Sequence, residues 1–138
     1  MVTKPESQGL ARETRWGKRI VDVLVIDDEQ EYLQSLAEGL RSYAREFNVI
    51  AADSATKALA ALKTIMVDVV VTDLNMPGMD GYELISKLQR TYPRVQTIVM
   101  TGYARSSIEK RLEGLRFAQF IEKPADLHEI AGAISSAA

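Results

Sequence analysis

Short segments rich in β-branched residues alternate with longer amphipathic segments along the chain from about residue 20 onward. Segments of this length and composition are typical of buried strands. The pattern predicts strands at Val21–Ile26, Asp68–Thr72, Val95–Met100 and Phe117–Ile121, and a more weakly marked fifth strand at Phe47–Ala52. Strands that are this uniformly apolar favour a sheet that is buried on both faces.

The segments between the predicted strands have the periodicity of amphipathic helices. Apolar side chains recur at three- and four-residue steps in Glu29–Tyr43, which places them on one face of a helix. Ser54 and Asp80 are suited to cap the next two helices, which extend to Ile65 and Arg90. Two further helices are predicted at Ala104–Leu115 and Leu127–Ser135.

Regular alternation of five strands with five helices predicts an α/β fold in which a parallel sheet is doubly wound, with helices on both faces. In such sheets, ligands bind beyond the carboxyl ends of the strands. The residues that directly follow each strand are therefore the first candidates for function.

Charge divides the chain of 138 residues into a short basic segment and an acidic domain. Residues 1–20 contain five basic and two acidic side chains, whereas residues 21–138 contain 12 basic and 17 acidic ones. We expect a flexible N-terminal extension, 1–20, and a domain, 21–138, that does not bind nucleic acid directly. No apolar run suggests a membrane span or a secretion signal, which favours a cytoplasmic protein without a membrane partner.

The composition also excludes several kinds of chemistry. The chain has no cysteine, so it forms no disulfide, thiolate nucleophile or cysteine-ligated zinc site. Its single histidine, His128, is the only one that a Ser-His-Asp triad could use. Carboxylates, hydroxyls and lysine remain as the groups that can do chemistry.

Polar residues follow four of the predicted strands. Asp27 and Asp28 come after the first strand, Asp73 after Asp68–Thr72, Thr101 after Val95–Met100, and Lys123 after the last strand. If the strands are neighbours, the carboxylates converge, and two of them 4 Å apart repel by about 4 kcal/mol at an effective dielectric constant of 20. Lys123 and a divalent cation, with Mg²⁺ favoured by oxygen ligands, would compensate this charge.

These residues resemble the four sequence signatures of the CheY-like receiver domain of bacterial two-component response regulators. The likeness rests on Asp27–Asp28, on the run Val71–Gly81 with its Asp-x-x-Met-Pro-x-Met-x-Gly pattern, on Thr101–Gly102 and on Lys123–Pro124. It covers about residues 20 to 138 and implies the flavodoxin-like strand order 2-1-3-4-5.

The resemblance implies a molecular switch that is controlled by phosphorylation of Asp73. Asp73 would be phosphorylated by a histidine kinase or a histidine phosphotransfer protein, and Lys123 would neutralise the phosphoryl oxygens. Asp28, Asp73 and the backbone carbonyl of Asn75 would bind Mg²⁺ directly, with Asp27 acting through a water. Such a domain assists its own phosphorylation and dephosphorylation but is not a turnover enzyme.

The resemblance also implies how the signal leaves the site. Thr101 would donate its hydroxyl to the phosphoryl group and move inward, Gly102 would offer an unobstructed amide, and Pro124 would follow a cis peptide bond. Phe120 occupies the position of an aromatic switch, although a core phenylalanine explains it equally well. Tyr103 is expected to shield the phosphorylated aspartate from water.

The signal would reach a downstream target or output domain through the surface of the fourth helix, fifth strand and fifth helix, through which two copies can also form a homodimer. A pseudo-receiver that binds partners without phosphorylation is the main alternative. An aspartyl phosphatase is disfavoured because Asn75 stands where those enzymes need a second acid, and nucleotide binding is disfavoured because no Gly-rich loop follows the first strand.

Overall fold

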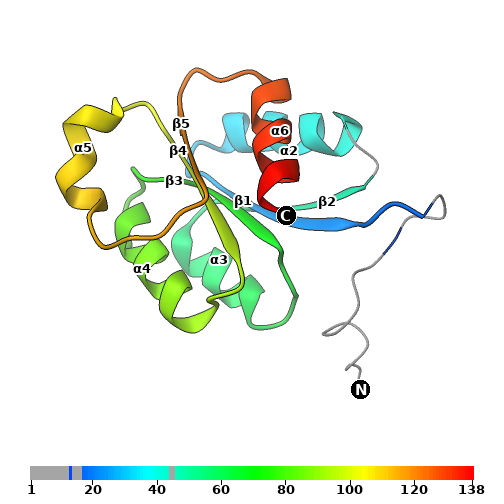
Figure 1. The fold of residues 1–138 in the computed structure, drawn as a ribbon, viewed down its shortest axis with the longest axis horizontal. Coiled ribbons are helices and arrows are strands. Elements are labelled where there is room, and N and C mark those ends of the chain that lie inside the picture. Colours follow the sequence, from blue (N-terminus) through cyan, green and yellow to red (C-terminus); the bar gives the residue numbers. More distant parts are fainter. Residues whose placement is uncertain (1–12, 14–16, 44–45) are drawn as a thin grey trace.

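The computed structural model describes residues 13, 17–43 and 46–138. Most of the expected N-terminal extension lies outside these residues. Five parallel strands form one sheet in the order β2-β1-β3-β4-β5, as the resemblance implied (Figure 1). The strands are β1 (Val21–Ile26), β2 (Phe47–Ala52), β3 (Val69–Asp73), β4 (Gln96–Thr101) and β5 (Gln119–Glu122).

The helices of the described residues cover both faces of the sheet (Figure 1). They are α2 (Gln30–Tyr43), α3 (Ala55–Leu62), α4 (Gly81–Thr91), α5 (Arg105–Leu112) and α6 (Leu127–Ala137). Helices α2 and α6 pack on one face, and α3, α4 and α5 pack on the other. The prediction of a doubly wound α/β domain is confirmed.

Alternate residues of each strand serve the two layers, because successive side chains of a strand point to opposite faces. In β1, Val23 and Val25 pack with α2 and α6, whereas Leu24 and Ile26 pack with α3 and α4. All four side chains are at most 1% exposed. Burial on both faces is the reason that the strands are continuous apolar runs instead of alternating ones.

Several boundaries differ from the predicted ones in ways that matter for function. Asp73 and Thr101 are the last residues of β3 and β4, not the first residues after them. Strand β5 begins at Gln119, not at the predicted Phe117. Phe117 precedes the strand, and its ring packs on that of Phe120 in β5. Ordered strand ends give the polar residues at this edge of the sheet fixed positions.

Side-chain caps mark where α3, α4 and α6 begin. The predicted caps are confirmed: Ser54 accepts a hydrogen bond from the Lys57 amide, and Asp80 accepts one from the Glu83 amide. Asp126, which the sequence analysis did not identify, caps α6 in the same way. Helix α3 ends at Leu62, earlier than the predicted Ile65, in a turn of 3₁₀-type bonds.

No helix in the described ranges has both the length and the apolar character that crossing a bilayer demands.

Candidate functional site

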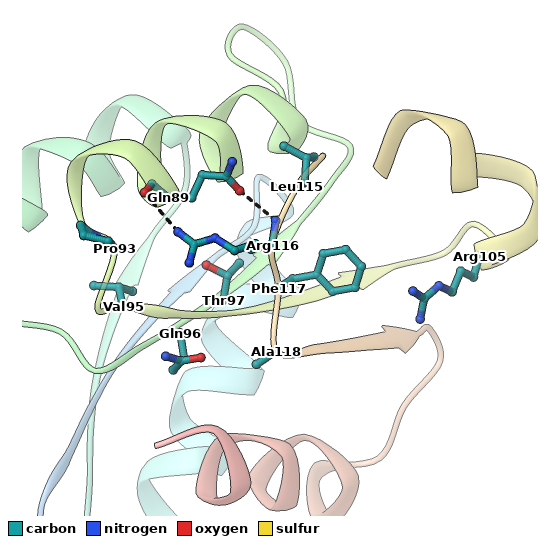
Figure 2. A pocket seen from close by; sticks show the side chains of 10 residues that line it. All are labelled: Gln89, Pro93, Val95, Gln96, Thr97, Arg105, Leu115, Arg116, Phe117 and Ala118. Carbon is teal, nitrogen blue, oxygen red and sulfur yellow. Dashed lines mark hydrogen bonds between the residues drawn. The ribbon is translucent and has the colours of Figure 1, made fainter. Parts of the chain in front are cut away.

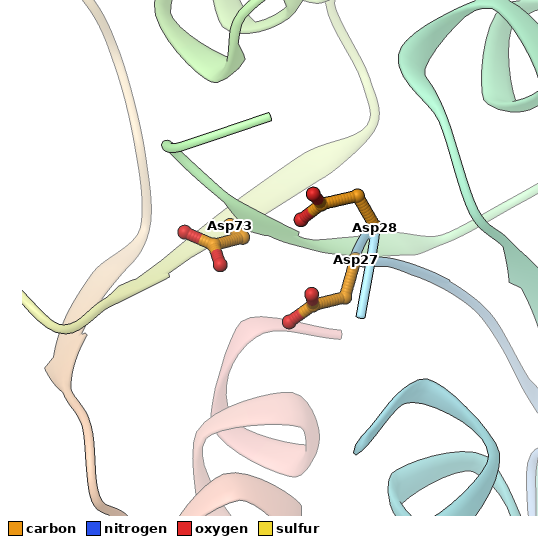
Figure 3. A group of neighbouring side chains, drawn as sticks. All are labelled: Asp27, Asp28 and Asp73. Atoms are coloured by element: carbon orange, nitrogen blue, oxygen red, sulfur yellow. The ribbon is translucent and has the colours of Figure 1, made fainter. Parts of the chain in front are cut away.

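Three carboxylates meet at the carboxyl end of the sheet (Figure 3). Asp27 and Asp28 follow β1, and Asp73 ends β3, which pairs with β1 in a register that places Ile26 opposite Thr72. One oxygen from each carboxylate lies within 4.8 Å of the others. The convergence predicted from the strand ends is confirmed.

Lys123 reaches this cluster from the loop that follows β5. Its Nζ donates hydrogen bonds to Asp27 Oδ2 at 2.9 Å and to Asp73 Oδ2 at 3.0 Å. The Lys123–Pro124 peptide bond is cis, as the resemblance implied. The lysine, which follows the edge strand β5, therefore links the ends of the two inner strands β1 and β3.

Opposing effects act on the pKa of Lys123. Burial alone would lower the pKa, but the hydrogen bonds to Asp27 and Asp73 and the charges of these carboxylates outweigh it and raise the pKa. The ammonium group is therefore fully protonated at neutral pH. It compensates one of the three carboxylate charges.

The donor set of this cluster fits a hard divalent cation. All three side chains offer carboxylate oxygens, and among the described residues only Lys123 forms ion pairs with them, which leaves two negative charges there uncompensated. Asp27 is 1% exposed, whereas Asp28 is exposed, so one side of the cluster faces solvent. An open side suits Mg²⁺, which keeps several of its waters when it binds to proteins.

Backbone contacts hold the Asp73 carboxylate in place. The amide of Asn75 donates to Asp73 Oδ1 at 3.0 Å, and the amide of Gly81 donates to the carbonyl of Leu74 at 3.0 Å. A Cβ at Gly81 would lie 2.5 Å from the Asp73 carbonyl oxygen, a distance that real structures do not allow. Gly81 thus lets α4 begin directly against the end of β3, a requirement that the sequence analysis missed.

The residues after β4 are arranged around the Thr101 hydroxyl. Thr101 is fully buried, and its Oγ1 accepts a hydrogen bond from the Tyr103 amide at 3.3 Å. A Cβ at Gly102 would meet no protein atom within 4 Å, so space beside its backbone is open. The Tyr103 side chain is 49% exposed. The roles expected for these three residues stay predictions.

Phe120 lies half-buried in β5, on the face of the sheet that α5 covers. Its ring centroid is 6.3 Å from that of Phe117, and the Arg105 guanidinium lies over both rings, at 5.6 Å and 5.4 Å from their centroids. The switch role and the core role of Phe120 both remain open.

A cavity of about 500 Å³ lies beside this aromatic pair (Figure 2). Its walls include Gln96 and Thr97, which begin β4, whereas Asp73 pairs with Met100 near the end of that strand. The cavity is thus at the other end of the sheet from the carboxylates, and it is not the site that the strand-end residues form.

Tyr32, like Gly81, is a residue of the site that the sequence analysis did not identify. The Lys123 Nζ lies 4.4 Å from its ring centroid, and its hydroxyl donates to Met100 Sδ at 3.7 Å. Burial raises the pKa of Tyr32, with the charge of Lys123 acting in the other direction. The sequence analysis had predicted only an amphipathic helix over Glu29–Tyr43, which contains Tyr32. The polar hydroxyl of Tyr32, five residues after Asp27, was the available signal.

Comparison with known proteins agrees with this geometry. The family model for the response regulator receiver domain matches residues 23–135. The chain belongs to the response regulator receiver domain family. Receiver domains are thus what the fold, the carboxylate cluster and the lysine jointly indicate.

The relatives that the chain resembles are longer proteins. It is 33% identical over 104 residues to the response regulator protein FleR of Pseudomonas aeruginosa, covering 74% of this chain and 21% of FleR. It is 32% identical over 111 residues to the sensor kinase CckA of Brucella abortus, covering 79% of this chain and 12% of CckA. The chain therefore spans about a fifth or less of these relatives.

A solved structure also matches the receiver domain over most of its length. The signal receiver domain of an HD domain-containing protein from Pseudomonas fluorescens Pf-5 is 28% identical, with a TM-score of 0.78. The match covers 86% of this chain and 94% of that one.

Proposed function

We propose that this receiver domain is a phosphoacceptor switch in a two-component system, with Asp73 as the residue that is phosphorylated. The position of Asp73 carries the proposal: it is 8% exposed, ends a central strand, and its Oδ2 lies 3.0 Å from the only ammonium group at the cluster among the described residues. A buried carboxylate that is held beside a cation and two further carboxylates suits phosphoryl transfer better than simple capping of a turn.

In the proposed reaction an Asp73 oxygen attacks the phosphorus atom of the donor. The new bond is the oxygen–phosphorus bond of an acyl phosphate, and the bond from phosphorus to the donor group breaks, with its electron pair leaving on the donor. Lys123, already charged and 3.0 Å from Asp73 Oδ2, is placed to neutralise the phosphoryl oxygens. Asp28, Asp73 and the Asn75 carbonyl would hold Mg²⁺, with Asp27 acting through a water, and the ion would supply further positive charge for those oxygens.

The donor is proposed to be a histidine kinase or a histidine phosphotransfer protein, and the receiver to be a reagent in the reaction, not a turnover enzyme. Thr101 and Phe120 would then change position and alter the surface of α5, β5 and α6. That surface would control a downstream target, an output domain or pairing of two copies. The surface would exist in two states, one with Thr101 and Phe120 moved and one without. Phosphorylation would shift the equilibrium between them only as far as the two states differ in affinity for the phosphoryl group.

The direct test is the intact mass of the protein after incubation with acetyl phosphate, with Mg²⁺ and with a chelator. We expect wild type to gain one phosphoryl group only when Mg²⁺ is present, and Asp73→Asn to gain none. Equal modification of Asp73→Asn would show that another residue is the acceptor. Absence of modification in wild type that still binds Mg²⁺ would favour the pseudo-receiver.

A further inference from the structure

We propose that Tyr32 is a positioning residue for phosphoryl transfer: its ring holds the Lys123 ammonium group at the acceptor carboxylate. The inference rests on the phosphoacceptor function proposed above. It concerns a residue of α2, on a different element from the carboxylates, from Thr101 and from Lys123 itself.

The contact has the geometry of a cation–π interaction. Lys123 Nζ lies 4.4 Å from the Tyr32 ring centroid, inside the distance of about 6 Å at which the negative face of an aromatic ring attracts a cation. The lysine side chain is 19% exposed, so little water competes for the ammonium group. The ring and the two carboxylates, Asp27 and Asp73, together leave the Nζ atom few other positions.

The ring is itself fixed from two directions. Tyr32 packs against the core between α2 and the sheet, and its hydroxyl donates to Met100 Sδ at 3.7 Å. Met100 is the β4 residue that pairs with Asp73 in the sheet. Tyr32 therefore ties the position of the lysine to the strand that lies beside the acceptor.

This placement affects the rate because a lysine side chain has four rotatable bonds and a strongly hydrated head group. Without the ring, the ammonium group can leave the carboxylates for solvent, and ordering it again adds to the barrier of the transfer step. Groups that are already oriented toward developing charge do not add such a reorganisation cost. Tyr32 contacts neither the phosphoryl group nor the carboxylates in this scheme; it acts only through Lys123.

The test compares Tyr32→Phe, which keeps the ring, with Tyr32→Leu, which removes it. We expect Y32L to slow phosphorylation by acetyl phosphate roughly three- to tenfold at saturating Mg²⁺, and Y32F to remain within about twofold of wild type. In a Lys123→Ala background, Y32L should cause no further loss. An equal loss in both backgrounds, or the same loss in Y32F as in Y32L, would assign Tyr32 a merely structural role and overturn the proposal.

A spectroscopic measurement tests the contact without any phosphodonor. Protons that lie over an aromatic ring resonate upfield, so the Lys123 ε-methylene signals should be shifted upfield in wild type and Y32F and not in Y32L. Absence of the shift in wild type would overturn the proposal. Should Y32L fail to fold by circular dichroism, Y32M, with a flexible side chain that fills irregular gaps, takes its place.

The outcomes separate this inference from the function on which it rests. A wild-type protein that takes up no phosphoryl group overturns the phosphoacceptor function, and this role with it. Normal phosphorylation of Y32L overturns the role of Tyr32 alone.

Discussion

The two oxygens of Asp73 have different partners, and this difference is visible at the scale of single atoms. Oδ1 accepts from the Asn75 amide and Oδ2 from the Lys123 ammonium group. A carboxylate has about four acceptor positions, so each oxygen keeps one lone pair that these bonds do not use. These bonds can therefore hold Asp73 in place while each of its oxygens keeps an electron pair that is free to react.

Tyr103 provides a prediction at the same scale. Its side chain is 49% exposed, and its amide is tied to the Thr101 hydroxyl, which keeps it next to the end of β4. We expect the phosphorylated Tyr103→Ala variant to lose phosphate faster than phosphorylated wild type, because the smaller side chain gives water freer access to the phosphorylated aspartate. The loss is followed by intact mass after the donor is removed. A slower loss in Y103A than in wild type would contradict the prediction.

At the scale of elements, the start of α4 and the end of β3 are in direct backbone contact at Gly81. We expect Gly81→Ala to lower the free energy of unfolding by about 1–3 kcal/mol, since the added Cβ forces the two elements apart. It should also slow phosphorylation, because Asp73 moves with the strand end. Chemical denaturation and the acetyl phosphate reaction measure the two effects.

Gly132 in α6 is the matched control for this substitution. A Cβ there would meet nothing within 4 Å, so Gly132→Ala should leave phosphorylation unchanged and stabilise the protein by up to about 1 kcal/mol. Similar behaviour of the two variants would mean that the close approach at Gly81 is not what matters.

Helix α5 is attached to β5 partly through Arg105, whose guanidinium lies over Phe117 and Phe120. If Phe120 turns inward on phosphorylation, it must leave this cation, at a cost of about 0.5–1 kcal/mol for an exposed pair. We therefore expect Arg105→Ala to raise the ratio of inward to outward Phe120 about two- to fivefold. NMR resonances of the Phe120 ring, measured on partly phosphorylated protein, report that ratio.

Arg111 lies on the same helix and offers a control for this prediction. Its guanidinium lies 3.7 Å from the Tyr82 ring centroid and pairs with Asp80, whereas the rings under the Arg105 guanidinium are Phe117 and Phe120. Arg111→Ala should leave the Phe120 resonances as they are in wild type. A matching effect of the two variants would point to general loosening of α5.

For the whole molecule, the uncompensated charge at the sheet edge links the free energy of unfolding to divalent cations. We expect Mg²⁺ to stabilise the folded chain by about 2.7 kcal/mol when present at roughly 100 times its dissociation constant, since the unfolded chain has no such cluster. Thermal unfolding with Mg²⁺ and with a chelator measures this. Asp28→Asn, which removes an exposed ligand, should lose most of the gain; full gain in D28N would place the ion elsewhere.

The sequence predicted the elements and the convergence of Asp27, Asp73 and Lys123 because parallel strands bring their carboxyl ends to one edge. The strand order needed the family resemblance, since periodicity does not say which strands are neighbours. The contacts of Gly81 and Tyr32 could not be predicted in this way. Both depend on how closely a particular helix approaches the sheet, and a helical pattern records only which side faces inward.

The two faces of the sheet also divide the site between them. Asp73 shares the face of Val69 and Val71, on which Tyr32 also packs, whereas Thr101 shares the face of Val99 and Phe120. After a gene duplication, one copy can therefore accumulate changes in the α5 layer and acquire a new partner while it keeps Asp73 and Tyr32 on the other face. Chimaeras that combine layers from two relatives would exploit the same independence in the laboratory.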